Sequence, residues 1–302
     1  MRLLVLGYGY TGRAIAAAAV AAGHAVAATV RRTEVVADPG VTLVPFAALA
    51  EAVVDCTHLA ATAPPGPEGD PALVAAGVAI RDAPVLRWIG YLSTTGVYGD
   101  RDGGRVDEAT EPAPGQDRSR RRLATETAWR ALADRRTVDI FRLAGIYGPG
   151  RSVLDELRAG TARHIVAPDH LFSRIHRDDI VRAVLRAMEQ ASSPGVRVFN
   201  LCDDEPAASA DVLAEAARLL GIAPPPARTL AGAWPTMSPM ARSFWGERRR
   251  VSSAATRARL GLDWLYPTYR EGLRAILDAE DQAASSATTV SSSARSDGRE
   301  RR

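Results

Sequence analysis

The sequence predicts an α/β protein with a doubly wound parallel sheet, and three observations support this fold class. Short apolar runs alternate with longer stretches of helical spacing through the N-terminal half of the chain. The first run, residues 3–6, leads through a glycine-rich turn into the alanine-rich stretch 14–22. The composition is that of an ordinary globular protein, since 46% of the 302 residues are hydrophobic and 24% are charged.

The strands of this sheet are expected at the apolar runs, which are bounded by turn residues or helical stretches. After residues 3–6, these runs lie at 25–30, 41–44, 58–61, 86–92, 138–143 and 196–201. Helical spacing predicts helices at 180–188, 211–220 and 268–277, and the arginine-rich run 118–122 is expected to begin another. Two segments are expected to be irregular, because 100–118 is rich in Gly, Asp, Glu and Pro and 222–247 is interrupted by prolines.

Charge and cysteine content exclude several classes of protein. There are 38 basic and 35 acidic residues, and a net charge of +3 gives no electrostatic reason to expect nucleic-acid binding. Cys56 and Cys202 belong to no Cys/His cluster, so we expect buried, inert thiols and neither a disulfide framework nor a metal site. No apolar run is long enough to span a membrane, and a cytoplasmic location is expected.

The chain has no lysine, and all 38 of its Lys and Arg positions are arginines. High-GC coding bias is a sufficient explanation of this composition. The chemical consequence is independent of its cause. A Schiff base, a Walker A motif and the lysine of a Tyr-x-x-x-Lys pair are all excluded.

A dinucleotide site is predicted at the first turn. The segment Leu3–Gly12 places the pattern Gly-x-Gly-x-x-Gly between a strand and a helix. In this pattern Gly7 permits the tight turn, Gly9 lets the backbone approach a diphosphate, and Gly12 allows the helix to pack closely on the strand. Tyr10 and Thr11, at the start of the helix, are therefore candidate cofactor contacts together with these glycines. The alternative is a glycine-rich turn that binds no ligand.

The end of the second strand favours NADP(H) over NAD(H). An NAD site has an Asp or Glu there for the ribose 2′-hydroxyl, whereas this strand is followed by Arg31 and Arg32. A pair of guanidinium groups suits a 2′-phosphate, and a carboxylate would repel it. The alternative is that both arginines are simply solvated at the end of the strand.

Five short motifs occur in an order that resembles the extended short-chain dehydrogenases/reductases, the NAD-dependent epimerase/dehydratase family. They are found at 88–99, 107–114, 141–151, 174–180 and 199–201, so the resemblance covers about residues 1–277. It implies a Rossmann-type domain formed by 1–148 and 171–202, and a smaller C-terminal substrate domain formed by 149–170 and 203–278. Residues 279–302 have no apolar period and are expected to form a disordered tail.

The resemblance also implies an active site, which this chain only partly retains. The family uses a Ser/Thr and a Tyr-x-x-x-Lys pair, followed by a glutamate. When Glu126 is aligned with that glutamate, Thr94 takes the Ser/Thr position, Arg118 the tyrosine position and Arg122 the lysine position. The chain therefore resembles an atypical subgroup of the family, with Thr94 and Arg122 as candidate catalytic residues.

Arginine cannot replace the missing tyrosine as a proton donor, because its pKa lies above about 12. Arg118 or Arg122 could still stabilise an oxyanion or hold the nicotinamide ribose. The proton must come from elsewhere, and Tyr98, Tyr147 and His176 are the candidates nearest these motifs. Tyr147, Arg174 and His176 are also the candidate substrate contacts.

For some of these residues a purely structural role is equally plausible. His176 could be local scaffolding at the start of a helix capped by Asp178 or Asp179. Trp234, Phe244 and Trp245 could line a substrate pocket or merely anchor the proline-rich segment to the core.

We therefore expect an NAD(P)-dependent oxidoreductase or epimerase/dehydratase that acts on a small soluble metabolite. The alternative is a protein that binds NADP(H) without turnover, as a redox sensor or regulator. No nucleic-acid, membrane or metal partner is expected. A homodimer is expected from the family resemblance alone.

Overall fold

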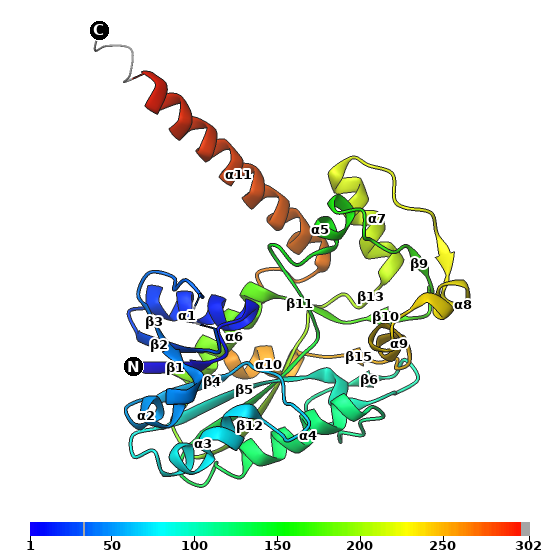
Figure 1. Cartoon of the computed structure of the whole chain (residues 1–302). Helices are drawn as coiled ribbons and strands as arrows, with labels where there is room; N and C mark the ends of the chain where they lie inside the picture. The colour runs from blue at the N-terminus through cyan, green and yellow to red at the C-terminus, as the bar shows by residue number, and fades with distance from the viewer. Residues whose placement is uncertain (33, 297–302) are drawn as a thin grey trace.

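The computed structural model describes residues 1–32 and 34–296, with side chains to residue 282, and contains a seven-stranded parallel sheet (Figure 1). The strand order is β3-β2-β1-β4-β5-β7-β12, which confirms the predicted doubly wound fold. Each hydrogen-bonded pair in this sheet is parallel. The strands are β1 (Arg2–Leu6), β2 (Ala25–Val30), β3 (Val41–Pro45), β4 (His58–Ala61), β5 (Trp88–Thr94), β7 (Thr137–Leu143) and β12 (Gly195–Leu201).

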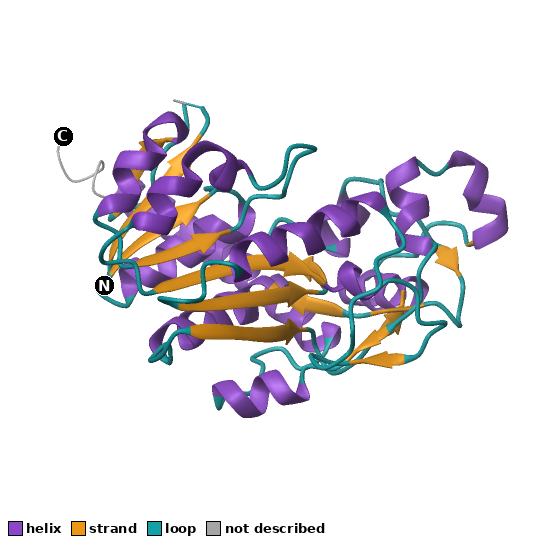
Figure 2. Ribbon diagram, turned by 90° about the horizontal axis from the view of Figure 1, so that it is seen from below, coloured by secondary structure: helices purple, strands orange, loops and turns teal. Residues whose placement is uncertain are grey.

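Helices cover both faces of the sheet (Figure 2). Alternate residues of β1 divide the core, with Leu3 and Val5 in one cluster and Leu4 and Leu6 in the other. The first cluster includes side chains of α1 (Tyr10–Ala21), α6 (Arg177–Glu189) and α10 (Ala254–Leu260). The second includes side chains of α2 (Leu49–Val54), α3 (Pro71–Asp82) and α4 (Asp117–Arg130). Both faces are thus apolar, as expected for a parallel sheet.

A smaller region beyond the carboxyl ends of the strands contains four two-stranded pairs. They are β8 (Gly145–Tyr147) with β11 (Arg174–His176), β9 (Ile165–Val166) with β14 (Arg228–Thr229), β10 (Leu171–Phe172) with β13 (Ala207–Ala208), and β6 (Arg105–Val106) with β15 (Arg250–Val251). A separate apolar cluster joins Tyr147 to α5 (Val153–Arg158), α7 (Ser209–Leu220) and the start of α11 (Tyr269–Ser296).

Two segments that were expected to be irregular contain short elements. The loop 100–118 includes β6, and α4 begins within it at Asp117. The proline-rich segment 222–247 contains α8 (Leu230–Ala233), the 3₁₀ turn η3 (Trp234–Thr236) and α9 (Pro239–Trp245). These helices are short, and Pro235 and Pro239 occupy first-turn positions, where proline is tolerated. Two further 3₁₀ turns are η1 (Phe46–Ala48) and η2 (Thr95–Tyr98).

The disordered tail expected from residue 279 is wrong for residues 279–296, which continue α11 away from the rest of the molecule (Figure 1). The segment contains neither glycine nor proline, and Glu280 forms an ion pair of 2.7 Å with Arg158 of α5. Compositional polarity predicted disorder here, although it is equally compatible with a solvated helix. Residues 297–302 lie outside the described part of the chain.

Candidate functional site

The glycine motif forms the turn between β1 and α1. Gly7 has a φ of 102°, and a Cβ at Gly12 would lie 2.0 Å from the carbonyl oxygen of Gly7. A side chain at either position would therefore be strained or would clash with backbone. Gly9 is the N-cap of α1, whose first turn has neither a side-chain cap nor an acidic residue. The N–H groups at this helix end are consequently available to an anion.

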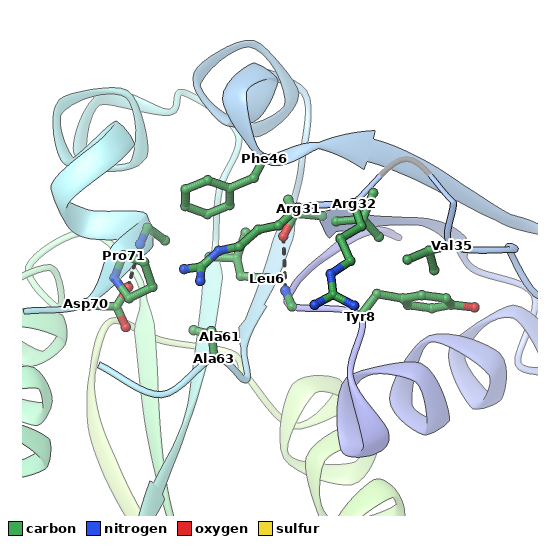
Figure 3. Close-up of a pocket in the computed structure, with 14 residues that line it drawn as sticks. Leu6, Tyr8, Arg31, Arg32, Val35, Phe46, Ala61, Ala63, Asp70 and Pro71 are labelled. Carbon is green, nitrogen blue, oxygen red and sulfur yellow. Dashed lines mark hydrogen bonds between the residues drawn. The ribbon is translucent and has the colours of Figure 1, made fainter. Parts of the chain in front are cut away.

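A first cavity, of about 260 Å³, opens beside this turn at the carboxyl ends of β1, β2 and β4 (Figure 3). Arg31 and Arg32 line it, and both side chains are exposed. The Arg31 guanidinium lies 5.4 Å from the centre of the Phe46 ring, which is within the range of a cation–π contact. The two arginines predicted to read the cofactor therefore share a cavity with the glycine turn.

Asp70 is the carboxylate in the lining of this first cavity, and both of its oxygens already have partners. Its Oδ1 accepts hydrogen bonds from the N–H groups of Ala72 and Leu73 at the start of α3. Its Oδ2 accepts a hydrogen bond from the Trp129 indole at 3.1 Å. Burial raises the pKa of Asp70. This carboxylate is thus engaged in a helix cap and is poorly placed to bind a ribose hydroxyl.

Tyr10 connects α1 to the loop that follows β8. Its hydroxyl donates a hydrogen bond to the Pro149 carbonyl at 3.1 Å. The guanidinium groups of Arg151 and Arg177 lie 5.5 and 5.2 Å from its ring centre. Tyr10 lines none of the cavities described here, whereas Thr11 is buried at the wall of the second one. As placed, Tyr10 orients a loop next to the cofactor turn.

A second cavity, of about 490 Å³, contains both candidate catalytic residues in its wall. Thr94 ends β5, and its Oγ1 accepts a hydrogen bond from the N–H of Gly96 at 3.1 Å, so the hydroxyl proton is free to donate. Arg122 of α4 donates through Nη1 to the Tyr91 hydroxyl at 3.0 Å and to the Leu92 carbonyl at 2.8 Å. The structure thus brings Thr94 and Arg122 together at the end of one strand.

A buried ion pair between Glu126 and Arg142 lies next to the end of β5. Glu126 is fully buried in α4 and accepts hydrogen bonds from Ser93 at 2.7 Å and from Arg142 at 3.1 and 2.8 Å. The Arg142 guanidinium also lies 4.8 Å from the Tyr98 ring centre, and the Tyr98 hydroxyl donates to Asn200. Tyr98, one candidate proton donor, is therefore committed to this buried layer.

A third cavity, of about 390 Å³, adjoins the second and shares Thr94, Arg118 and Phe244 with it. Tyr147 and Arg174, two of the candidate substrate residues, line this cavity. The Tyr147 hydroxyl donates to the Thr268 carbonyl at 3.4 Å, and burial raises its pKa far above the usual range. Tyr147 is therefore an unfavourable proton donor at neutral pH.

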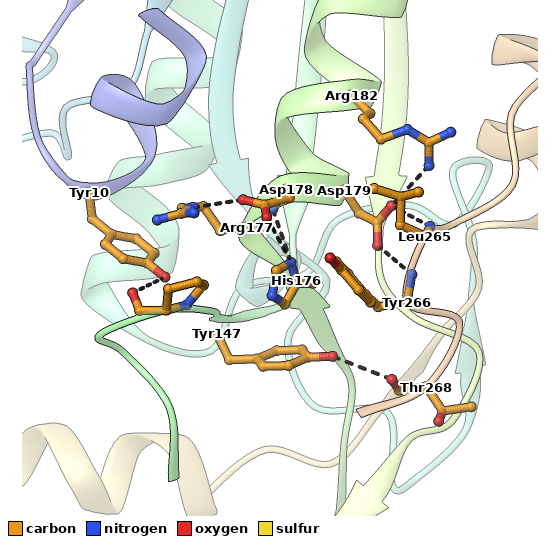
Figure 4. A network of polar contacts seen from close by, with 11 residues as sticks. Tyr10, Tyr147, His176, Arg177, Asp178, Asp179, Arg182, Leu265, Tyr266 and Thr268 are labelled. Carbon is orange, nitrogen blue, oxygen red and sulfur yellow. Dashed lines mark hydrogen bonds and ion pairs between the residues drawn. The ribbon is translucent and has the colours of Figure 1, made fainter. Parts of the chain in front are cut away.

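His176 does not line any of the three cavities. It is buried between Tyr147 and Tyr266, with ring centres 5.2 and 4.2 Å away (Figure 4). Its Nδ1 accepts a hydrogen bond from the N–H of Asp178 at 3.2 Å, which makes it the N-cap of α6. Burial lowers its pKa to about 4. His176 thus has a structural role as the cap of α6, while its Nε2 is buried without a hydrogen-bond partner among the described residues, and the predicted substrate contact stays a prediction.

The predicted N-cap, Asp178 or Asp179, is also wrong. Both lie in the first turn of α6, after the cap residue His176. The Asp179 carboxylate instead accepts hydrogen bonds from the N–H groups of Leu265 and Tyr266, at 2.7 and 3.1 Å. It therefore ties the C-terminal segment to α6, a long-range contact that local capping rules do not address.

Several lining residues were not predicted, or were predicted only as alternatives. Phe244 and Trp245 do line the third cavity, together with Phe172, Glu247 and Arg249. Pairing of β15 with β6 carries this segment there, over a sequence separation too long for local patterns to reveal. Arg151 lines the second cavity, and its position directly after the Gly-Pro-Gly run was the signal that could have identified it.

Cys56 and Cys202 are free and buried, as predicted, and burial raises the pKa of each thiol to about 12. Among the described residues, no group of three or more His, Cys, Asp or Glu could hold a metal ion. Within the same part of the chain, no helix has both the length and the apolar character needed to cross a bilayer.

Comparison with solved structures identifies the fold as that of the NAD-dependent epimerases and dehydratases. A dTDP-glucose 4,6-dehydratase from Bacillus anthracis, in complex with NAD, superimposes with a TM-score of 0.74 at 16% identity, over 93% of this chain and 97% of that one. A UDP-glucuronic acid 4-epimerase from Bacillus cereus, also with NAD, gives 0.72 at 16% identity over 92% and 96%. The fold implied by the family resemblance is thereby confirmed.

A more similar structure defines the family. A functionally unknown conserved protein from Silicibacter pomeroyi is 39% identical, with a TM-score of 0.84 over 92% of this chain and 98% of that chain. The chain therefore belongs to the same family as this protein. No protein-family profile matches the sequence.

Two curated proteins share part of the sequence. Protein YeeZ of Escherichia coli strain K12 is 34% identical over 137 residues, which is 45% of this chain and 47% of YeeZ. A 3-diazoavenalumate denitrifying reductase from a Streptomyces species is 33% identical over 147 residues, 44% of this chain and 45% of the reductase. The matched region thus spans about half the length of each curated relative.

Proposed function

We propose that this protein is an NADP(H)-dependent oxidoreductase, of the atypical extended short-chain type, acting on a small metabolite. The observation that carries the proposal is the uncapped glycine turn, which opens onto cavities at the carboxyl ends of the parallel strands. In this type of sheet, nucleotides bind where neighbouring strands connect in opposite directions, here between β1 and β4. The partial match to a reductase supports reduction over epimerisation or dehydration.

The residues present fit a phosphorylated dinucleotide. The turn formed by Gly7, Gly9 and Gly12 would hold the diphosphate, and Arg31 and Arg32 would hold a ribose 2′-phosphate. No free carboxylate competes in the described lining of the first cavity, because Asp70 is occupied by α3 and Trp129. The NAD complexes among the structural relatives make NAD(H) the alternative cofactor.

The chemistry of the chain's own residues is limited to polarisation and charge stabilisation. A bound nicotinamide cofactor would supply or accept a hydride. Thr94 can donate a hydrogen bond to a substrate oxygen, and Arg118 and Arg122 can stabilise negative charge on it. Neither arginine can release a proton at neutral pH, so solvent is the proton source that this site leaves available.

The cofactor assignment can be tested by calorimetry with NADPH and NADH. Replacing Arg31 and Arg32 with Ala should weaken NADPH binding about 10- to 100-fold, because charge-assisted hydrogen bonds to a phosphate are lost. NADH binding should change little. Arg87→Ala is the matched control, since this exposed arginine directly precedes β5, at the amino end of the strand, and lines none of the three cavities. Equal losses for both cofactors would contradict the NADP preference.

Turnover distinguishes this proposal from a non-catalytic sensor, which the missing Tyr and Lys favour. Purified protein is incubated with NADPH and a panel of carbonyl compounds, and oxidation of the cofactor is followed by absorbance. Thr94→Ala should lower kcat about 100-fold, as expected when one donor to a developing oxyanion is removed, and Thr94→Ser should retain most of it. Tight NADPH binding without turnover on any carbonyl would support the sensor instead.

A further inference from the structure

The third cavity contains two arginines that have no carboxylate within ion-pair distance among the described residues. Arg174 donates through Nη1 to the carbonyls of Phe172 and Ala207, at 2.9 and 3.0 Å, which leaves its other N–H groups unassigned. Arg118 lies 4.1 Å from the centre of the Phe244 ring. Burial lowers the pKa of both guanidinium groups. The wall thus carries fixed positive charge at a cost in desolvation.

The carboxylates near this cavity do not neutralise that charge. Glu247 is already paired with Arg249 at 2.7 Å, and its side chain is 8% exposed. Asp203 is close enough to affect Arg174, but burial raises the pKa of Asp203 to about 8, so it is mostly protonated at neutral pH. Its side chain has no hydrogen-bond partner among the described residues. The cavity therefore has a positive charge that an incoming anion would balance.

The same cavity has an aromatic wall. The rings of Phe172 and Trp245 meet edge to face with centres 5.0 Å apart, and Phe244 lies at the junction with the second cavity. Phe244 is 51% exposed, and the Arg118 guanidinium lies over its ring, so this aromatic face and the positive charge occupy the same part of the wall. With a volume of about 390 Å³, the cavity lies near the small end of the range for ligand sites.

Building on the proposed oxidoreductase function, we propose that the third cavity binds a small organic anion with a ring-sized apolar body. Arg174 and Arg118 hold its carboxylate or phosphate, and Phe172, Trp245 and Phe244 contact the ring. Arg174 supplies the paired donors that suit a planar anion, and Arg118 approaches from α4. A guanidinium group matches carboxylate and phosphate oxygens alike, so the probes include both anions.

The experiment is calorimetric titration of the full chain, with and without NADPH, using matched charged and neutral probes. The probes are benzoate, 4-hydroxycinnamate and phenyl phosphate, the neutral compound benzamide, and UDP-glucose as a larger anion. At least one aromatic anion should bind at least about 10-fold more tightly than benzamide, because only the anion compensates the arginines. The relative affinities of the carboxylates and phenyl phosphate identify the anionic group.

Two variants locate the site. Arg174→Gln should weaken binding of the aromatic anion about 10-fold or more, whereas Arg87→Gln, the control outside the cavities, should leave it unchanged. Arg118→Gln provides a second test on the exposed surface of α4, in case the Arg174 variant folds poorly. In the Arg174 variant NADPH binding should persist, and the circular-dichroism spectrum of each variant should match that of the unmodified protein, which shows that the fold is intact.

The proposal is overturned if benzamide binds as tightly as the anions, if no probe binds, or if neither arginine variant affects binding. It is also overturned if UDP-glucose binds more tightly than every aromatic anion, because the cavity would then take a larger ligand. Failure of NADPH to bind would instead contradict the proposed cofactor, and the anion titrations without NADPH would still decide this inference.

Discussion

Arg142 and Arg174 are both on strands that lead to the candidate site, yet their surroundings differ. Arg142 of β7 is buried and forms two hydrogen bonds to the Glu126 carboxylate. Arg174 of β11 donates only to backbone carbonyls and faces a cavity. The comparison shows that the partner, and not the residue type, separates a structural arginine from one available to a ligand. A sequence with 38 arginines and no lysine cannot reveal this difference by composition.

The largest effect is expected at the paired arginine. Glu126→Gln would leave the Arg142 guanidinium buried without a counter-charge, and breaking such a pair costs about 3–5 kcal/mol of unfolding free energy. Chemical denaturation measures the loss. Adding Arg142→Met should recover part of it, because the uncompensated charge is removed with its partner.

The matched control is Glu215→Gln, which breaks the ion pairs of Glu215 with Arg218 on α7 and with Arg270 on α11, whose side chain is 51% exposed. The Arg218 side chain is 60% exposed there, so the expected change is below about 1 kcal/mol. If Glu126→Gln lowers the unfolding free energy no more than this control does, the buried pair does not stabilise the fold. The distinction drawn between Arg142 and Arg174 would then be contradicted.

The next effect depends on pH and concerns Asp203 beside the unpaired arginine. Its folded pKa of about 8 lies above the ordinary 3.8, so the unfolded chain releases the proton first as the pH rises. Stability from this group is therefore full below about pH 4 and is lost progressively up to about pH 8. The charged or titratable groups that act on Asp203 include Arg174 and Asp204, and Asp203 in turn acts on Tyr147.

Asp203→Asn removes this penalty. The Tm of the variant should therefore exceed that of the wild type by a few degrees at pH 8 and by less at pH 5. Thermal unfolding at the two pH values measures the difference. A constant gap between the variant and the wild type would mean that Asp203 does not titrate in this interval.

The smallest effect on stability is expected at Arg174 itself. Arg174→Gln loses hydrogen bonds to two carbonyls but also removes a charge that no carboxylate balances, so the two contributions offset. The expected change in unfolding free energy is below about 1 kcal/mol, measured by the same denaturation series. A loss as large as that of Glu126→Gln would make Arg174 a structural residue and remove the contrast with Arg142.

The sheet could be predicted from sequence because its strands are buried on both faces and appear as continuous apolar runs. The predicted strands 25–30 and 58–61 coincide with β2 and β4, and the others differ by one or two residues at their ends. The prediction of a disordered tail was wrong for residues 279–296, because a polar segment of Ser, Thr and Ala without Gly or Pro can form either a helix or a disordered chain. The predicted N-cap of α6 was wrong. The Asp179 carboxylate accepts hydrogen bonds from the N–H groups of residues 265 and 266, which are distant in the sequence.

The site was predictable where the backbone geometry requires a particular residue type. At Gly7 and Gly12 only glycine fits without strain or a clash. Thr94 and Arg122 were located through the order of family motifs, and they meet at the wall of one cavity. The aromatic wall formed with Trp245 was left undecided, because it depends on the pairing of β15 with β6. The capping role of His176 could not be separated from a ligand contact in the sequence, because both roles use the same residue type.

The bond from the Tyr10 hydroxyl to the Pro149 carbonyl has a kinetic consequence. It connects the helix that begins at the glycine turn to the loop that carries Arg151. A displacement of the helix start is therefore transmitted to this part of the wall of the second cavity. A ligand that immobilises the helix start would also fix that loop before a second ligand arrives. Initial-rate patterns should accordingly show a compulsory order of addition, with the coenzyme first, and Tyr10→Phe should make the order random.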